Sequence, residues 1–424
     1  MTHALAVKTV DAVADRLADP ATTPLGPEVE PSHRQHLAYG PTGIALLHIE
    51  RAAAGAGSWQ RAHAWLTAAA REPFTSGPGS HAFYGAPALA HALSCAAEHL
   101  PDAYQRARDS LNRQMSVDVS RRLSAANHRA DAGHPPELAE FDTIRGLVGY
   151  GAYFLRHDPA GTAVRAILDY CVRLAEPIVH EGEVLPGWWT STGPSGRPDN
   201  RFSGGHANSG MAHGIGGVLA LLALAMRRDI TVGGHREALS TFLAWLNRWQ
   251  VESGPGLSWP YWVTRDELRS GRLTPSAPRR PSWCYGTVGI ARAKQLAALA
   301  LGNVDGQVEA EAALVAALTD VAQLKATTDN GLCHGFAGLA HVAARTAADA
   351  RPSTVGQLRA AISPLLGIVC PPGAVAEDLA NAVIQDMEAG PGFLNGASGM
   401  ALALLAPATT TAPVTAWDSC LLIA

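Results

Sequence analysis

Two cysteines and two histidines lie at equivalent places in the sequence, each just ahead of a glycine that opens an apolar run. His213 precedes Gly214, and Cys284 and Cys333-His334 lie one or two residues ahead of the glycines of the next two such runs. Cys284, Cys333 and His334 make up a Cys₂His set. Soft sulfur and imidazole donors suit zinc, and three protein ligands are typical of a catalytic zinc with one open position. The shared register of these residues predicts one Zn²⁺ per chain.

Two other interpretations stay open on these residues alone. The cysteines could be unconnected, with His334 only capping a helix, or His213 could be a fourth ligand that closes the site and makes it structural. The remaining four cysteines lie in apolar settings, and we expect them to be small core residues rather than a disulfide framework. They are Cys95, Cys171, Cys370 and Cys420.

The elements that position these side chains are predicted by a repeat. A Gly-x-x-Gly step followed by an apolar run recurs along the chain, with a degenerate copy at Gly85, and a helix that is apolar on every side is a buried one. The first glycines of the seven copies are Gly40, Gly85, Gly146, Gly214, Gly286, Gly335 and Gly396. Amphipathic segments alternate with the runs at about 3–18, 58–72, 103–125, 162–178, 235–250, 307–325 and 354–389, the last long enough for two helices.

This alternation predicts an all-α fold, with seven buried helices in an inner ring and the amphipathic helices in an outer ring. We expect a single α/α toroid domain over residues 1–424. The turns before the inner helices would open at one end of the barrel, so that the residues ahead of the glycines share one rim. The glycines themselves are explained by close packing where the helix ends converge.

Composition limits the function classes. With 33 Lys and Arg against 37 Asp and Glu, the net charge of −4 argues against a dedicated nucleic-acid binder. A hydrophobic share of 47% with 17% charged residues excludes disorder for most of the chain. The longest apolar run, 216–226, is too short for a membrane helix, and residues 1–18 lack the apolar core of a signal peptide. We therefore expect a cytoplasmic protein.

The motifs around these residues resemble those of the lanthionine synthetase C-like (LanC-like) family. They read Ala212-His213-Gly214-Ile215, Trp283-Cys284-Tyr285-Gly286 and Cys333-His334-Gly335. The resemblance extends over nearly the whole chain through the glycine repeats. It implies a seven-fold α/α toroid, with Cys284, Cys333 and His334 as zinc ligands and His213 as an acid/base residue rather than a ligand.

The resemblance also assigns three further residues. Asp142 falls where the family keeps a functional aspartate, Arg280 matches the arginine of its Arg-x-x-Trp-Cys-Tyr-Gly pattern, and Tyr285 matches its tyrosine. Each has a structural alternative: Asp142 could cap a helix, Arg280 could be a solvated loop arginine, and Tyr285 could simply line the rim. Two departures concern the glycine repeats. Ala88 replaces the second glycine of one copy, beside Pro87, and the copy at 214–217 has Gly where Pro or Ala is usual before its last Gly.

The reaction implied is intramolecular addition of a peptide cysteine thiol to dehydroalanine or dehydrobutyrine, which gives a lanthionine or methyllanthionine thioether ring. The chain resembles the stand-alone cyclase, and its expected partners are a dehydrated precursor peptide and, in a biosynthetic complex, a dehydratase and an exporter. Such partners would associate it with a membrane. Alternatives are a LanC-like protein that adds glutathione or another external thiol to dehydroamino acids, or a non-catalytic zinc scaffold.

Two Gly- and Pro-rich stretches, at about 182–212 and 252–283, interrupt the helices just before the site motifs. Both carry aromatic residues. Long loops inside a compact domain are often functional, so one hypothesis is that these stretches cover the mouth of the toroid and contact the peptide. The alternative is that their aromatic side chains only fix the loops to the core.

Overall fold

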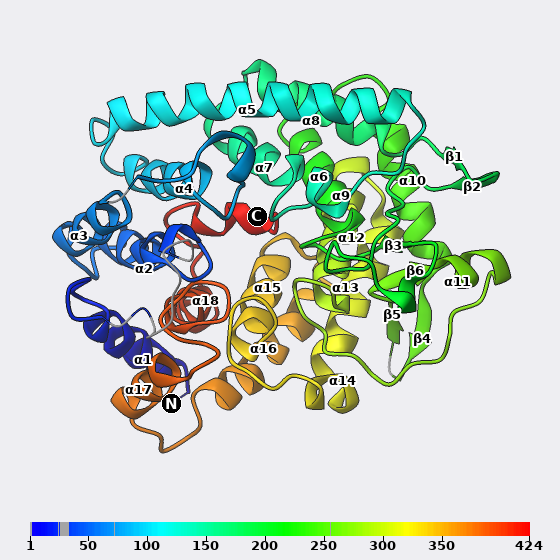
Figure 1. The fold of residues 1–424 in the computed structure, drawn as a ribbon. Helices are drawn as coiled ribbons and strands as arrows, with labels where there is room; N and C mark the ends of the chain where they lie inside the picture. The colour runs from blue at the N-terminus through cyan, green and yellow to red at the C-terminus, as the bar shows by residue number, and fades with distance from the viewer. Residues whose placement is uncertain (1, 24, 26–33, 72, 255) are drawn as a thin grey trace. The chain divides into compact units, whose positions relative to one another are not determined.

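The computed structural model describes residues 2–23, 25, 34–71, 73–254 and 256–424 (Figure 1). Contacts divide the chain into two compact units. The first comprises residues 1–115 and 327–418, and the second comprises residues 116–326 and 419–424. The expectation of one domain over the whole chain stays a prediction. In the part of the chain described, no helix combines the length and apolar character needed to cross a bilayer.

Seven buried helices begin directly after the repeat glycines, as predicted. They are α2 (Pro41–Ala53), α4 (Ala86–Ala97), α7 (Leu147–His157), α9 (Ile215–Met226), α12 (Thr287–Leu301), α15 (Phe336–Asp349) and α18 (Ala397–Thr409). Helix α4 is buried at every position, and α9 at every position except Met226. The apolar runs are therefore buried on all sides because each helix has neighbours all round.

The amphipathic segments are helical too. They form α1 (Thr2–Arg16), α3 (Trp59–Ala69), α5 (Gln105–Asp131), α8 (Thr162–Arg173), α10 (His235–Arg248), α13 (Val304–Thr319), α14 (Val321–Lys325), α16 (Val355–Val369) and α17 (Ala376–Gln385). The segment predicted at 307–325 is split, because Asp320 caps a new helix by accepting a hydrogen bond from the backbone N–H of Ala322. The segment at 354–389 divides into two helices at Pro371 and Pro372, where a helix cannot continue.

Within each unit the helices pack in the order of the chain. Pairs such as α2 with α3, α12 with α13 and α15 with α16 lie side by side as helical hairpins (Figure 1). Buried helices are also neighbours: α7, α9 and α12 in one unit, and α15, α18, α2 and α4 in the other. In the second set the last buried helix, α18, packs on the first, α2. The turns at the starts of neighbouring buried helices are therefore brought close together.

The second glycine of a repeat allows the turn to fold back against its own helix. A Cβ atom at Gly289 would lie 2.0 Å from the carbonyl oxygen of Trp283, and one at Gly338 would lie 1.9 Å from that of Leu332. No side chain fits at such distances, so the glycine is required by close approach. The degenerate copy differs as its sequence suggests, since Gly85 has φ of 72° whereas the other first glycines have negative φ.

Short strands lie in and just before the two Gly- and Pro-rich stretches, and one pair of strands joins the two stretches. The strands are β1 (Ile178–His180), β2 (Glu183–Leu185), β3 (His206–Asn208), β4 (Val251–Ser253), β5 (Gly256–Ser258) and β6 (Trp262–Thr264), in three antiparallel pairs. Strand β3 pairs with β6, so that Ala207 lies opposite Val263. Short helices α6 (Leu138–Phe141) and α11 (Arg265–Ser270) and the 3₁₀ turns η2 (Gly77–Gly79), η3 (Asn200–Phe202) and η4 (Trp417–Leu421) complete the described elements.

Candidate functional site

Three turns of the second unit are joined by hydrogen bonds at the starts of α7, α9 and α12. The backbone N–H of Thr143 donates to the carbonyl of Ala212 at 3.1 Å, and the N–H of Ala212 donates to the carbonyl of Cys284 at 3.0 Å. The hydroxyl of Thr143 donates to the carbonyl of Met211 at 2.6 Å. This ladder fixes the positions of Asp142, His213 and Cys284 relative to one another.

Asp142 and His213 form the central contact of this cluster. Oδ2 of Asp142 lies 2.6 Å from Nδ1 of His213. The aspartate is buried, whereas the histidine side chain keeps 23% of its surface exposed. A carboxylate on Nδ1 holds the imidazole in one orientation and leaves Nε2 available to move a proton. Sequence motifs 71 residues apart are thus brought together as a pair of the kind used in general acid–base catalysis.

The same carboxylate also performs the capping role that the sequence left open. Its Oδ1 accepts hydrogen bonds from the backbone N–H groups of Arg145 and Gly146, at 2.5 and 2.9 Å. One oxygen therefore secures the turn before α7 while the other holds His213. The two interpretations of Asp142 are compatible, and the turn contacts explain why the carboxylate stays in position.

Tyr285 lies beside His213 within a group of aromatic rings. Its ring centroid is 5.9 Å from that of His213, 5.5 Å from that of Tyr261 and 6.2 Å from that of Trp262. Burial raises the pKa of Tyr261 to about 12. Its hydroxyl is therefore protonated and donates a hydrogen bond to the backbone carbonyl of Arg280, at 2.8 Å.

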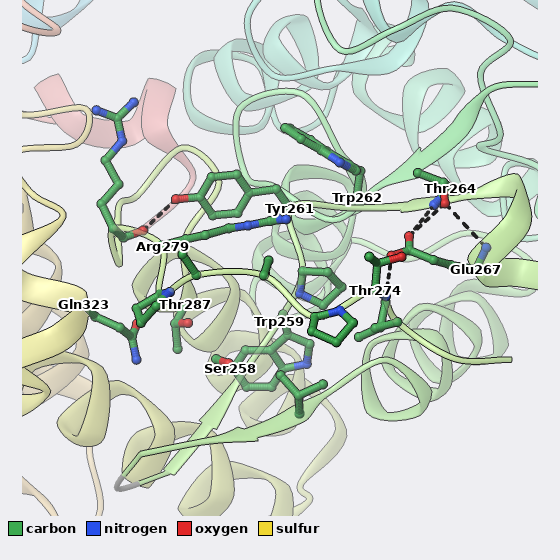
Figure 2. A pocket seen from close by; sticks show the side chains of 18 of the residues that line it. Ser258, Trp259, Tyr261, Trp262, Thr264, Glu267, Thr274, Arg279, Thr287 and Gln323 are labelled. Atoms are coloured by element: carbon green, nitrogen blue, oxygen red, sulfur yellow. Dashed lines mark hydrogen bonds between the residues drawn. The ribbon is translucent and has the colours of Figure 1, made fainter. Parts of the chain in front are cut away.

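The backbone of Arg280 belongs to this cluster, because its carbonyl accepts the hydrogen bond from the Tyr261 hydroxyl. Arg280 is also among the residues that line a cavity of about 660 Å³, together with residues of the second Gly- and Pro-rich stretch. Thr287, at the start of α12, lines the same cavity (Figure 2). No hydrogen bond or ion pair is found between the Arg280 guanidinium and His213 among the contacts of the described residues, so its proposed role in catalysis stays a prediction.

The predicted zinc ligands are divided between the two units. Cys284, in the second unit, is buried, and its Sγ lies 3.4 Å from Oγ of Ser282. Cys333 and His334 belong to the first unit, where the backbone N–H of Cys333 donates to the carbonyl of Leu394 at 2.8 Å. The surroundings of Cys284 are therefore described within the second unit, and those of Cys333 and His334 within the first.

His334 has a partner that the sequence analysis did not single out. Its Nδ1 lies 2.7 Å from Oδ2 of Asp329, whose Oδ1 accepts a hydrogen bond from the backbone N–H of Gly331 at 2.8 Å. Histidines that bind metals typically donate their other ring N–H to a carboxylate, which fixes the tautomer. The donor types and the Asp329 contact fit a zinc ligand at His334.

A complete metal cluster is not seen in the described residues. No three or more His, Cys, Asp or Glu side chains of this part of the chain are grouped so as to hold an ion. The zinc ion and its three ligands therefore stay predictions from the sequence. The other four cysteines are buried, which confirms the expectation of core residues.

Three residues near the site had only weak signals in the sequence. Tyr261 and Arg279 lie in a Gly- and Pro-rich stretch whose contacts cannot be read from spacing. Asp329 lies five residues before His334. An acidic residue so close in sequence to a candidate zinc ligand was the only sign that the two side chains would be in contact.

Comparisons with known proteins show the family to which this chain belongs. The family model "Lanthionine synthetase C-like protein" matches residues 31–422. "Nisin biosynthesis protein NisC" of Lactococcus lactis subsp. lactis is 26% identical over 246 residues, which are 57% of this chain and 56% of that protein. In that alignment, therefore, the chain spans little more than half of its relative's length.

A solved structure extends the likeness to the whole fold. "Nisin cyclase" superposes with a TM-score of 0.76 at 21% identity, over 93% of each chain. At this identity the match is evidence for the fold alone. It confirms the predicted fold class, an all-α toroid. With a family model matched from residue 31 to residue 422, the chain belongs to the lanthionine synthetase C-like family.

Proposed function

We propose that this protein is a zinc-dependent cyclase that joins a peptide cysteine to a dehydroalanine or dehydrobutyrine of the same peptide. The observation that carries the proposal is the contact between Asp142 and His213 in a LanC-like chain. The names of the two relatives, a nisin biosynthesis protein and a nisin cyclase, support a cyclisation reaction.

Zinc is the proposed cofactor, held by Cys284, Cys333 and His334. A zinc ion there would lower the pKa of the substrate thiol and keep the sulfur nucleophilic. Two cysteine ligands cancel the charge of the dication, so the sulfur of the substrate would be held less tightly than by a site of neutral ligands. Asp329 orients the His334 ring in this arrangement.

His213 is the proposed general acid. Attack of sulfur on the β-carbon leaves an enolate, which must receive a proton at the α-carbon. Nε2 of His213 supplies that proton, while Asp142 stabilises the charged imidazolium through Nδ1. Arg280 and Tyr285 are the candidates for stabilising the enolate oxygen, by charge and by a hydrogen bond respectively.

The test uses a synthetic peptide with one dehydroalanine and one cysteine. Ring formation leaves the mass unchanged and removes the free thiol, so thiol alkylation followed by mass spectrometry measures it. We expect the wild type to consume the thiol and His213→Ala to lose this activity while keeping its zinc. Unchanged product formation by His213→Ala would refute the catalytic role of the histidine.

Two further arms separate the alternatives. A peptide without cysteine, supplied with glutathione, tests addition of an external thiol, which would show as a gain of one glutathione mass. Metal analysis of the wild type beside Cys284→Ala and Cys333→Ala tests the zinc set, with about one zinc per chain expected and loss in both variants. Zinc without either reaction would favour a scaffold.

A further inference from the structure

The cavity beside the aromatic cluster contains an arginine that the proposed chemistry does not use. Arg279 lies along Tyr261 and toward Trp262 (Figure 2), with its guanidinium carbon 4.8 Å and 5.4 Å from the two ring centroids. Stacking on aromatic faces holds the guanidinium plane and leaves its N–H donors free at the edges. The side chain is therefore oriented before any ligand binds.

One donor of this guanidinium lacks an acceptor. Nη1 of Arg279 is buried, and no described residue accepts a hydrogen bond from it. A buried donor that has lost water without gaining a partner is unfavourable. Arg279 as a whole keeps part of its surface exposed and lines the cavity. A carboxylate in the cavity can therefore meet its accessible N–H groups, and a small shift of the guanidinium would bring Nη1 to the second carboxylate oxygen, which matches its planar geometry.

The acidic side chains around the cavity do not fill this role. Glu267 accepts hydrogen bonds from the backbone N–H groups of Thr264 and Thr274 (Figure 2). Asp266 is almost fully exposed and forms an ion pair with Arg269 at 3.9 Å. Glu252 is exposed as well. Arg201, another arginine that lines the cavity, already forms an ion pair with Asp199 at 2.8 Å.

The position of the cavity connects it to the proposed chemistry. Arg279 contacts Tyr261, and Tyr261 lies against Tyr285. Tyr285 in turn lies against His213. Each of these three distances, from guanidinium carbon to ring centroid or between ring centroids, is under 6 Å. An extended peptide advances ~3.3 Å per residue, so at most about five residues are needed to span from Arg279 to His213. A peptide that reacts beside His213 can therefore place a group several residues away in the cavity.

We propose that this cavity is a substrate subsite that binds a carboxylate of the peptide through Arg279. The inference rests on the proposed function, because it takes the ligand to be the peptide that reacts beside His213. The carboxylate comes from an Asp or Glu side chain or from the peptide's C-terminus, within about five residues of the reacting cysteine.

The test measures binding of unreactive peptides by isothermal titration calorimetry. Each peptide carries one cysteine, and serine replaces dehydroalanine. The first has an amidated end and a glutamate about five residues from the cysteine. The second has glutamine there, and the third has glutamine and a free C-terminal carboxylate at that distance. We expect the wild type to bind the first, the third or both about tenfold more tightly than the second, equivalent to ~1.4 kcal/mol.

Two variants test whether the preference for a carboxylate depends on Arg279. Arg279→Gln should bind all three peptides equally, whereas the matched control Arg201→Gln, with the same change of charge at the same cavity, should keep the preference. The comparison of peptides on the wild type does not depend on the variants folding. Equal affinity of the wild type for the three peptides, a preference kept by Arg279→Gln, or one lost in Arg201→Gln would overturn the proposal.

The reactive counterparts of the same peptides distinguish this proposal from the proposed function. Cyclisation without any preference for a carboxylate would refute the subsite and leave the cyclase proposal standing. A carboxylate preference that requires Arg279, without any cyclisation, would support the subsite and refute the cyclase proposal.

Discussion

Replacing Asp142 by asparagine tests how the carboxylate controls His213. Oδ1 of Asp142 accepts hydrogen bonds from two backbone N–H groups, at 2.5 and 2.9 Å. In Asp142→Asn the amide oxygen must keep this place, so the amide N–H groups face Nδ1 of His213. Nδ1 must then accept a hydrogen bond, which moves the ring proton to Nε2 and deprives the imidazolium of its counter-charge.

The size of the effect follows from the contact that is lost. A hydrogen bond to a charged group contributes about 1.5–3 kcal/mol, which corresponds to a ~10- to 150-fold lower rate of cyclisation. The alkylation assay measures the rate. The ¹⁵N chemical shifts of the His213 ring measure the tautomer directly, without any peptide.

A matched variant controls for charge and capping. Asp320 also caps a turn of the second unit, through the backbone N–H of Ala322 at 2.8 Å, and has no contact with His213. Asparagine caps as well as aspartate, so Asp320→Asn should cyclise at the wild-type rate. The reasoning would be refuted if Asp142→Asn kept the wild-type rate and ring shifts, or if Asp320→Asn were slowed equally.

Three further predictions concern packing, metal retention and pH. Gly289→Ala places a Cβ atom 2.0 Å from a carbonyl oxygen and should lower the free energy of unfolding by about 1–3 kcal/mol in urea titrations, whereas Gly367→Ala on α16, with open space around the added atom, should not. If zinc is bound as proposed, Asp329→Ala should weaken its retention against a chelator by about 10- to 100-fold, and unchanged retention would show that the contact with His334 is dispensable. Burial lowers the pKa of His206 to about 4 from its usual 6.5, so the unfolded chain takes up the proton first as the pH falls. Stability should therefore drop between pH 6.5 and 4, by up to about 3 kcal/mol, and His206→Gln should show a shallower slope than the wild type.

The helices were predictable because their signals are local. An apolar run after a glycine specifies a buried helix wherever neighbours cover it, and all seven such helices begin at the residue after the repeat glycine. The boundaries were less predictable. Asp320, for example, ends one helix and caps the next, and nothing in the apolar pattern of that segment marks the change.

The candidate site was predictable in its residue types and less so in its contacts. Equivalent positions ahead of the glycines singled out His213, Cys284, Cys333 and His334 from the chain alone. The assignment of Asp142 needed the family resemblance, because an aspartate before a helix is usually a cap. The structure adds that its two oxygens have different partners.

Sequence alone determined which segments are helical, which are buried and which residues precede the repeat glycines, since these depend on side-chain type and on spacing along the chain. Tertiary structure decided what each of those residues touches. The ladder from Thr143 to Ala212 to Cys284, the pairing of β3 with β6 and the stacking of Arg279 on Tyr261 all join segments remote in sequence. Such contacts depend on how the helices pack, and no local pattern encodes them.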